Sequence, residues 1–397
     1  MTLSNGRHYL AIPGPSVLPA PVLRAMQRPA PNIYTGALVD LTDSLVPDLK
    51  TVAGGADNVA MYICNGHGVW EASLSNIASR GDRVLCLVTG YFGAGWVNVA
   101  RGLGLDAEVL DFGSQAEIDF DQVEAALRAD SSHEFKAVIC VHADTSTSGR
   151  NDIAGVRKAI DAAAHPALFM VDCIASMGCD PFLMRDWGVD VAITASQKGL
   201  MTPAGMGFVF FSDKAKAAQI GDLCSPYWDW RVRAEAAALY NYFDGTAPTQ
   251  HLYALRAALD MMMDEGMAAI WARHDHLARA YWAAFEAWGA GGDLRMHISD
   301  PDKRSRAVTA LSLPAPLASE LRRWMEDTAG VTLGISLGRV PMDDPAWHGY
   351  FRVGHMGHIN AHMVMGVLGT MDAGFKALGI AHGEGAVSAA AQVMAGS

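Results

Sequence analysis

The middle of the chain alternates short apolar runs with segments of helical periodicity. Between the apolar runs lie amphipathic stretches at residues 69–78, 120–128 and 153–164. Apolar runs without polar alternation predict strands of a mainly parallel sheet that is covered by helices on both faces. Ligands of such α/β folds bind beyond the carboxyl ends of the strands. The strands predicted in this region are residues 84–89, 107–112, 135–142, 167–174, 189–196 and 207–212.

The pattern changes after Pro248. Residues 252–289 predict one long helix or two, with Gly266 as a possible break. A smaller α+β pattern follows, while the Ala- and Gly-rich tail from residue 381 to 397 is only weakly patterned. We expect an N-terminal arm, a large domain and a small C-terminal α+β domain, over residues 1–20, 21–275 and 276–397.

Composition excludes several classes of protein. The 397 residues are 51% hydrophobic, yet no window reaches the roughly 18 uncharged apolar residues of a membrane helix. The net charge is −12 and no basic run is present, which argues against a nucleic-acid partner. The six cysteines are scattered and no signal sequence precedes them, so we predict reduced thiols and a cytoplasmic protein.

Two charged residues stand at the ends of predicted core strands. Asp172 ends the run ALFMVD, and Lys198 follows the next apolar run 26 residues later. Taken alone, Asp172 is equally well explained as a helix cap or a loop contact, and Lys198 as a surface lysine whose aliphatic stem lies over apolar side chains. Together they suit pyridoxal phosphate, whose aldehyde forms a Schiff base with a lysine and whose ring nitrogen pairs with an aspartate.

A glycine-rich turn precedes the predicted helix at residues 69–78. It reads Asn65-Gly66-His67-Gly68, and such a turn can present backbone N–H groups to a phosphate. It is neither a Walker loop nor a dinucleotide fingerprint, so a nucleotide-dependent oxidoreductase is disfavoured. The His274-Asp275-His276 segment would place its histidines on different faces of a helix, and we predict no metal site.

These motifs together resemble those of the class V aminotransferases of fold type I, and most closely the alanine/serine–glyoxylate subgroup. The resemblance runs from about Ile12 to Leu378. It implies a mainly parallel sheet of the seven-stranded type between helices, with a smaller C-terminal α+β domain. The motifs that carry it, in order, are Ile12–Pro15, Asn65–Glu71, Val171-Asp172, Ser196–Lys198 and Phe351–His355.

The resemblance implies a role for each matching residue around pyridoxal 5′-phosphate. Lys198 would form the Schiff base and shuttle a proton, and Asp172 would hold the ring nitrogen. Phe92 would stack on the ring and Thr145 would lie near its 3-hydroxyl. The residues expected to hold the phosphate are Asn65, Gly66, His67 and Gln197, with Thr246 contributed to the neighbouring subunit of a homodimer.

The substrate side of the resemblance implies a small amino acid and a 2-oxo acid. Arg352 would take the substrate carboxylate, with Gly14, Tyr34 and Arg339 beside it. The implied reaction moves an amino group from serine, alanine or aspartate to glyoxylate or pyruvate by a ping-pong mechanism.

The sequence departs from the family pattern near the substrate. The loop between Arg339 and Arg352 is longer than in the family. Arg339, the segment Arg352–Gly357 and the turn His142–Thr145 resemble pyridoxamine–pyruvate aminotransferase, in which free pyridoxamine is the amino donor. Ser148 stands where many relatives have glycine. A fold-type I lyase or desulfurase is a further alternative, although Gln197 precedes Lys198 where desulfurases usually have histidine.

Overall fold

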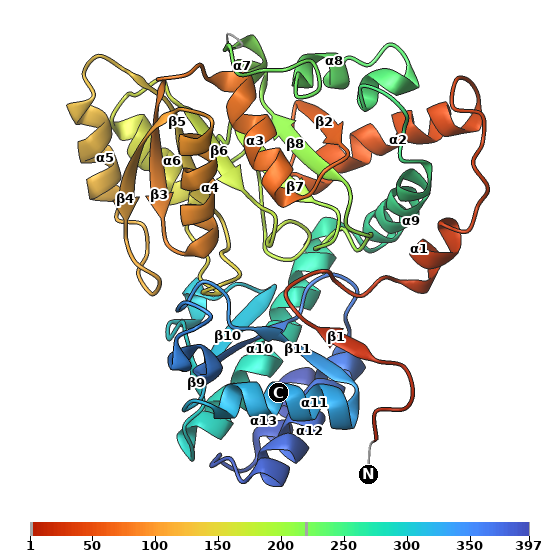
Figure 1. Ribbon diagram of the computed structural model, residues 1–397, viewed down its shortest axis with the longest axis vertical. Coiled ribbons are helices and arrows are strands. Elements are labelled where there is room, and N and C mark those ends of the chain that lie inside the picture. Colours follow the sequence, from red (N-terminus) through yellow and green to blue (C-terminus); the bar gives the residue numbers. More distant parts are fainter. Residues whose placement is uncertain (1–2, 219–220, 397) are drawn as a thin grey trace.

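The computed structural model describes residues 3–218 and 221–396, which form two sheets surrounded by helices (Figure 1). Within these residues the larger sheet has seven strands in the order β2-β8-β7-β6-β5-β3-β4. The predicted α/β fold is confirmed. The strands are β2 (Asn58–Tyr62), β3 (Arg83–Val88), β4 (Asp106–Asp111), β5 (Phe135–Val141), β6 (Leu168–Asp172), β7 (Val191–Ala195) and β8 (Gly207–Phe211).

The large sheet is parallel from β4 to β7, and β8 runs antiparallel to both of its neighbours. Every residue of β6, β7 and β8 is buried, which explains why their sequences lack polar alternation. The carboxyl ends of β5, β6 and β7 share one edge of the sheet, and β8 begins there because Gly207 pairs with Ala195.

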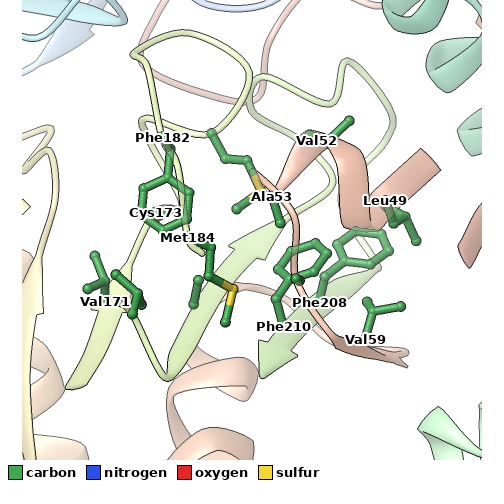
Figure 2. Packing of buried hydrophobic residues seen from close by; sticks show 14 of the residues in the cluster. Leu49, Val52, Ala53, Val59, Val171, Cys173, Phe182, Met184, Phe208 and Phe210 are labelled. Atoms are coloured by element: carbon green, nitrogen blue, oxygen red, sulfur yellow. The ribbon is translucent and has the colours of Figure 1, made fainter. Parts of the chain in front are cut away.

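Helices cover both faces of the large sheet. One face packs against α3 (Gly66–Ile77) and α4 (Tyr91–Gly102), in a cluster that contains Trp70 and Trp96. The helices on the other face include α2 (Ala37–Val52), α5 (Phe120–Ala129) and α6 (Ile153–Ala162). Figure 2 shows the packing on this second face, where Leu49 of α2 lies beside Phe208 and Phe210 of β8. Because helices cover both faces of the large sheet, the turns that follow its strands are accessible only along the edge formed by the strand ends.

The smaller sheet lies below the large one in Figure 1 and has the order β1-β11-β12-β10-β9. Its first strand comes from the N-terminal arm, because Tyr9 pairs in parallel register with Val331. The arm therefore crosses between the two sheets and brings residues 12–16 close to the large sheet. The strands are β1 (Tyr9–Ala11), β9 (Arg295–Met296), β10 (Val308–Ser312), β11 (Val331–Ile335) and β12 (Tyr350–Gly354).

Two long helices connect the sheets. They are α9 (Thr249–Glu265) and α10 (Met267–Ala290), and Gly266 separates them at a φ of +81°, which confirms the predicted break. The remaining helices and 3₁₀ turns are α1 (Ala20–Ala25), α7 (Asp213–Ala217), α8 (Trp230–Ala234), η1 (Leu239–Tyr242), η2 (Pro301–Lys303), α11 (Leu317–Ala329), η3 (Pro345–Gly349), α12 (Ala361–Leu378) and α13 (Ala386–Met394).

The weak pattern of the C-terminal tail was misleading, because the tail contains α13. Ala386 and Ala390 of α13 are buried in the core of the smaller sheet, and the helix packs closely on α10. Alanine gives a weak hydrophobic periodicity, yet its small side chain lets two helices approach closely. In residues 3–218 and 221–396 no helix is both long and apolar enough to cross a bilayer.

Candidate active site

The turns that follow the central strands enclose a cavity of about 250 Å³. It lies at the carboxyl edge of β5, β6 and β7, where an open α/β sheet binds its ligands. Most residues predicted to hold the coenzyme line it. The lining residues are Asn65, Gly66, His67, Trp70, Phe92, Val141, Ala143, Thr145, Asp172, Ile174, Ala175, Gln197 and Lys198.

Asp172 is the last residue of β6 and is buried. Its Oδ2 accepts a hydrogen bond of 2.7 Å from Trp70 Nε1, and its Oδ1 accepts one of 2.7 Å from the Ile174 backbone N–H. Burial nevertheless raises the pKa of Asp172 to about 7. The carboxylate is therefore fixed in orientation. None of the described residues forms an ion pair with it, so a protonated ring nitrogen would be a favourable partner.

Lys198 lies in the turn between β7 and β8. Its Nζ donates a hydrogen bond to the backbone carbonyl of Pro13, and its own carbonyl accepts one of 2.8 Å from Ser16 Oγ. Burial, followed by the nearby charge of Arg352, lowers the pKa of Lys198 to about 8. About a tenth of the amine is then neutral at pH 7, far more than for an ordinary lysine, and the neutral form is the one that a nucleophile or a proton carrier requires.

The N-terminal arm packs directly on Lys198 through Gly14. Gly14 has a φ of +100°, and a Cβ added there would overlap the Lys198 amine. Only glycine combines this backbone conformation with so close an approach. The predicted substrate-side glycine thus contacts the lysine itself.

The glycine-rich turn forms the start of α3. Asn65 caps the helix, because its Oδ1 accepts from the backbone N–H groups of His67 and Gly68 at 3.1 and 3.3 Å. The positive end of the helix dipole faces the cavity. The Gln197 side chain lies nearby, and in the described chain its buried Oε1 has no hydrogen-bond partner. This end of the cavity is polar, and at least one of its buried polar atoms lacks a hydrogen-bond partner among the described residues, as expected of a binding site.

The turn of residues 144–146 orders the opposite wall. Asp144 is buried, and its Oδ2 accepts from the Phe92 backbone N–H at 2.8 Å. Its Oδ1 accepts from Ser146 N at 2.9 Å and from Ser146 Oγ at 2.6 Å. Phe92 and Thr145, which both line the cavity, are therefore held by one carboxylate.

Arg352 is buried at 7% exposure in β12 and points toward the same turn. Its Nη1 donates to the Thr145 carbonyl at 3.1 Å and its Nε to the Ile335 carbonyl at 2.9 Å. Burial lowers the pKa of this guanidinium to about 10, so it stays charged at neutral pH. No carboxylate of the described residues forms an ion pair with it, which leaves the charge for a ligand.

Five predicted site residues are not among those that line the cavity: Gly14, which packs on Lys198, Arg352, which reaches the Thr145 carbonyl, and Tyr34, Thr246 and Arg339. Tyr34 is 81% exposed and Thr246 is exposed, whereas Arg339 lines a separate small cavity with Arg352. Thr246 does not line the cavity of its own chain.

Sequence reasoning missed Trp70 and Asp144 as site residues. Trp70 stands inside the glycine-turn motif, but an apolar helix position gave no reason to expect a hydrogen bond to an aspartate 102 residues away. Asp144 precedes Thr145 in the same turn, and a buried carboxylate between cavity residues was the available signal.

The geometry agrees with comparisons to known proteins. The sequence model of the aminotransferase class-V family matches residues 69–334, which include Asp172 and Lys198. The chain belongs to this family. A serine–glyoxylate aminotransferase of Methylorubrum extorquens is 37% identical to it over 377 residues, covering 92% of this chain and 90% of that protein. An L-aspartate–glyoxylate aminotransferase of Paracoccus denitrificans is 32% identical over 394 residues, covering 98% and 96%.

Solved structures of the family share the fold of this class-V aminotransferase. An alanine–glyoxylate aminotransferase from Nostoc sp. has a TM-score of 0.83 and 26% identity, covering 94% of this chain and 96% of that one. A pyridoxamine–pyruvate aminotransferase from Mesorhizobium loti has a TM-score of 0.88 over the full length of both chains, at 23% identity. The protein is a transaminase of this family.

Proposed function

We propose that this class-V aminotransferase uses pyridoxal 5′-phosphate to move an amino group from a small L-amino acid to glyoxylate or pyruvate. The donor would be serine, alanine or aspartate. The observation that carries the proposal is the placement of the Asp172 carboxylate and the Lys198 amine in one cavity. The names of two relatives, at 37% and 32% identity, support glyoxylate as the acceptor.

The residues around the cavity fit the coenzyme. Asp172 offers a fixed carboxylate to a ring nitrogen, and Lys198 offers a partly neutral amine. The start of α3 and the side chain of Gln197 provide a polar end, at which Gln197 Nε2 would donate to a phosphate. Phe92 and Thr145 would contact the ring between these two ends.

The mechanism assigns a task to each of the charged groups. When bound, pyridoxal phosphate supplies a carbonyl that condenses with amines and a ring that withdraws electrons from the substrate. Lys198 Nζ, once neutral, would take a proton from the substrate Cα and would deliver it to C4′ of the coenzyme. Arg352 holds the substrate carboxylate, so that the Cα–H bond keeps one orientation. Because donor and acceptor use the same cavity in turn, we propose ping-pong kinetics.

We also propose a homodimer with a shared active site. Thr246 is exposed in the segment between η1 and α9, so its hydroxyl is available to a second copy of the chain. Sedimentation of the wild type tests the dimer, and the coenzyme affinity of Thr246→Ala tests the contribution of this residue to its neighbour. A monomer at working concentrations would refute the shared site.

A specific experiment tests the coenzyme and the reaction. Protein incubated with pyridoxal phosphate is reduced with borohydride and digested, and we expect the modified peptide to contain Lys198. A matrix of amino donors and 2-oxo acids then identifies the substrates through the keto acids that are released. Lys198→Ala should show neither the labelled peptide nor the released keto acids, while the exposed Lys158→Ala should show both. Labelling at another lysine would refute the assignment.

One observation favours a second candidate, in which free pyridoxamine is the donor and pyruvate the acceptor. The Asn65 side chain already accepts from two backbone N–H groups at the start of α3, which a phosphate would otherwise use. Titration with pyridoxal and with pyridoxal phosphate decides between the two. Tighter binding of the unphosphorylated compound would support this second candidate.

A further inference from the structure

A second, smaller cavity adjoins the substrate arginine. Its volume is about 20 Å³, enough for one water-sized group such as a carboxylate oxygen. It lies between the smaller sheet and the turn of residues 144–146. The lining residues are Ser146, His297, Ala310, Leu311, Ser312, Ser336, Leu337, Arg339, Tyr350, Phe351 and Arg352.

Strand register brings the polar lining residues to one face of the smaller sheet. Arg352 pairs with Ala310 and Tyr350 pairs with Ser312, so these four side chains point to the same side. Arg352 reaches from this face to the Thr145 carbonyl. The cavity is therefore on the side of the sheet that faces the active site.

Arg339 brings a second positive charge to this cavity. Its guanidinium lies 5.2 Å from the centre of the Tyr350 ring and contacts His297 Nε2. Burial, together with the charge of Arg339, lowers the pKa of His297 to about 4, so the ring is neutral at physiological pH. In the part of the chain that is described, Arg339 forms no ion pair with a carboxylate.

Asp144 is the carboxylate that acts on both guanidiniums, but at longer range than an ion pair. Its two oxygens already accept hydrogen bonds from Phe92 and Ser146. Arg322 adds a further positive charge near Arg352, so the single charge of Asp144 does not balance the two guanidiniums of the cavity, and a second ligand carboxylate would reduce the excess of positive charge.

Ser336 provides an independent sign of a missing ligand. Its side chain is 1% exposed, and none of the described residues accepts from or donates to its Oγ. Buried hydroxyl groups are almost always hydrogen-bonded, so an unpartnered one in a cavity between two arginines points to an anionic ligand.

We infer that Arg339 and Ser336 form a second carboxylate subsite beside Arg352, which selects a short dicarboxylic amino acid as the amino donor. This inference rests on the proposed transamination and narrows its donor. The α-carboxylate would bind Arg352, and the side-chain carboxylate would bind the Arg339 guanidinium and accept from Ser336 Oγ.

Steady-state kinetics with aspartate and with alanine test the subsite. We expect the ratio of kcat/KM for aspartate over alanine to fall about 10- to 100-fold in Arg339→Met, the loss typical of a hydrogen bond to a charged group. Ser336→Ala should lower the same ratio less, and Arg339→Lys should retain part of it. The exposed Arg279→Met serves as control, because among the described residues Arg279 forms an ion pair only with Asp275, on the surface of α10.

Calorimetry of the coenzyme-loaded enzyme gives a readout that needs no turnover. Succinate should bind more tightly than propionate to the wild type, and Arg339→Met should remove the difference. An equal loss for aspartate and alanine, or equal binding of both acids to the wild type, would overturn the subsite. If no donor yields a keto acid, the proposed transamination fails instead, and the calorimetric result still judges the subsite.

Discussion

The backbone N–H of Phe92 donates a 2.8 Å hydrogen bond to Oδ2 of Asp144, across 52 residues of sequence. This bond fixes the start of α4 against the turn that follows β5. A Cβ added to Gly90 would lie 2.5 Å from Asp144 Cγ, so glycine before the helix makes the approach possible. Because Arg352 donates to the Thr145 carbonyl in the same turn, the cavity wall and Arg352 are held by the same turn.

Replacing this carboxylate should loosen the wall of the cavity. In Asp144→Asn the amide cannot accept at both of its ends, so Phe92 N or Ser146 N loses its partner, at a cost of about 1–3 kcal/mol. We expect coenzyme affinity to fall about 10-fold, measured by fluorescence titration.

A double-mutant cycle with Phe92→Leu separates positioning from general destabilisation. If Asp144 acts through Phe92, the two losses of coenzyme affinity are not additive. Asp119→Asn is the control, since Asp119 caps α5 with a similar pair of hydrogen bonds. Additive losses would contradict the positioning role.

The pH dependence of coenzyme attachment should report the amine of Lys198. Its pKa is lowered to about 8, chiefly by burial and then by Arg352. The neutral fraction rises about tenfold per pH unit below that value, so the attachment rate should rise with pH and level off above about 8.

In Arg352→Met the midpoint should move to higher pH, because a neighbouring positive charge no longer disfavours the protonated amine. Stopped-flow absorbance of the coenzyme-free protein measures both curves, with Arg279→Met as reference. A wild-type midpoint near the ordinary lysine value of 10.5 would refute the perturbed amine.

Asp172 should make the coenzyme-free protein less stable as pH rises. Its folded-state pKa is about 7 against an ordinary value of 3.8, so the folded protein binds the proton more tightly than the unfolded chain. The penalty is therefore absent below about pH 4 and complete above about pH 7, with a size of roughly 4 kcal/mol.

Asp172→Asn should remove this pH slope while keeping one of the two hydrogen bonds that Asp172 accepts. Urea unfolding of both proteins at several pH values measures the difference in the free energy of unfolding. If the free energy of unfolding changed with pH in the same way for both proteins, the Asp172 carboxyl would ionise at no cost to stability, which would contradict the prediction.

Gly14→Ala should disturb the lysine more than the fold. The φ of +100° costs alanine about 1–2 kcal/mol, and its Cβ would displace the Lys198 amine. We expect at least about a 10-fold loss in the rate of coenzyme attachment, assayed by borohydride trapping. Gly113→Ala carries a similar backbone strain at a φ of +80° with nothing within 4 Å, and it should lose stability only.

The sequence alone predicted the α/β fold and six of the seven strands of the large sheet, β3 to β8. Strands buried on both faces have near-continuous apolar sequences, so β6 and β7 were visible without a structure. Asp172 and Lys198 were recognisable because charged residues are rarely placed directly after such strands. In contrast, α13 was hidden, since its alanines pack by being small rather than by being strongly hydrophobic.

Only the tertiary structure decided which distant groups share an environment. The bonds from Trp70 to Asp172 and from Phe92 to Asp144 join residues 102 and 52 positions apart, and no local pattern encodes them. The lowered pKa of Lys198 likewise arises from burial by the fold and from the charge of Arg352. The residue types in the sequence therefore indicated which reaction the site could support, while long-range packing set the orientations and the pKa values of its side chains.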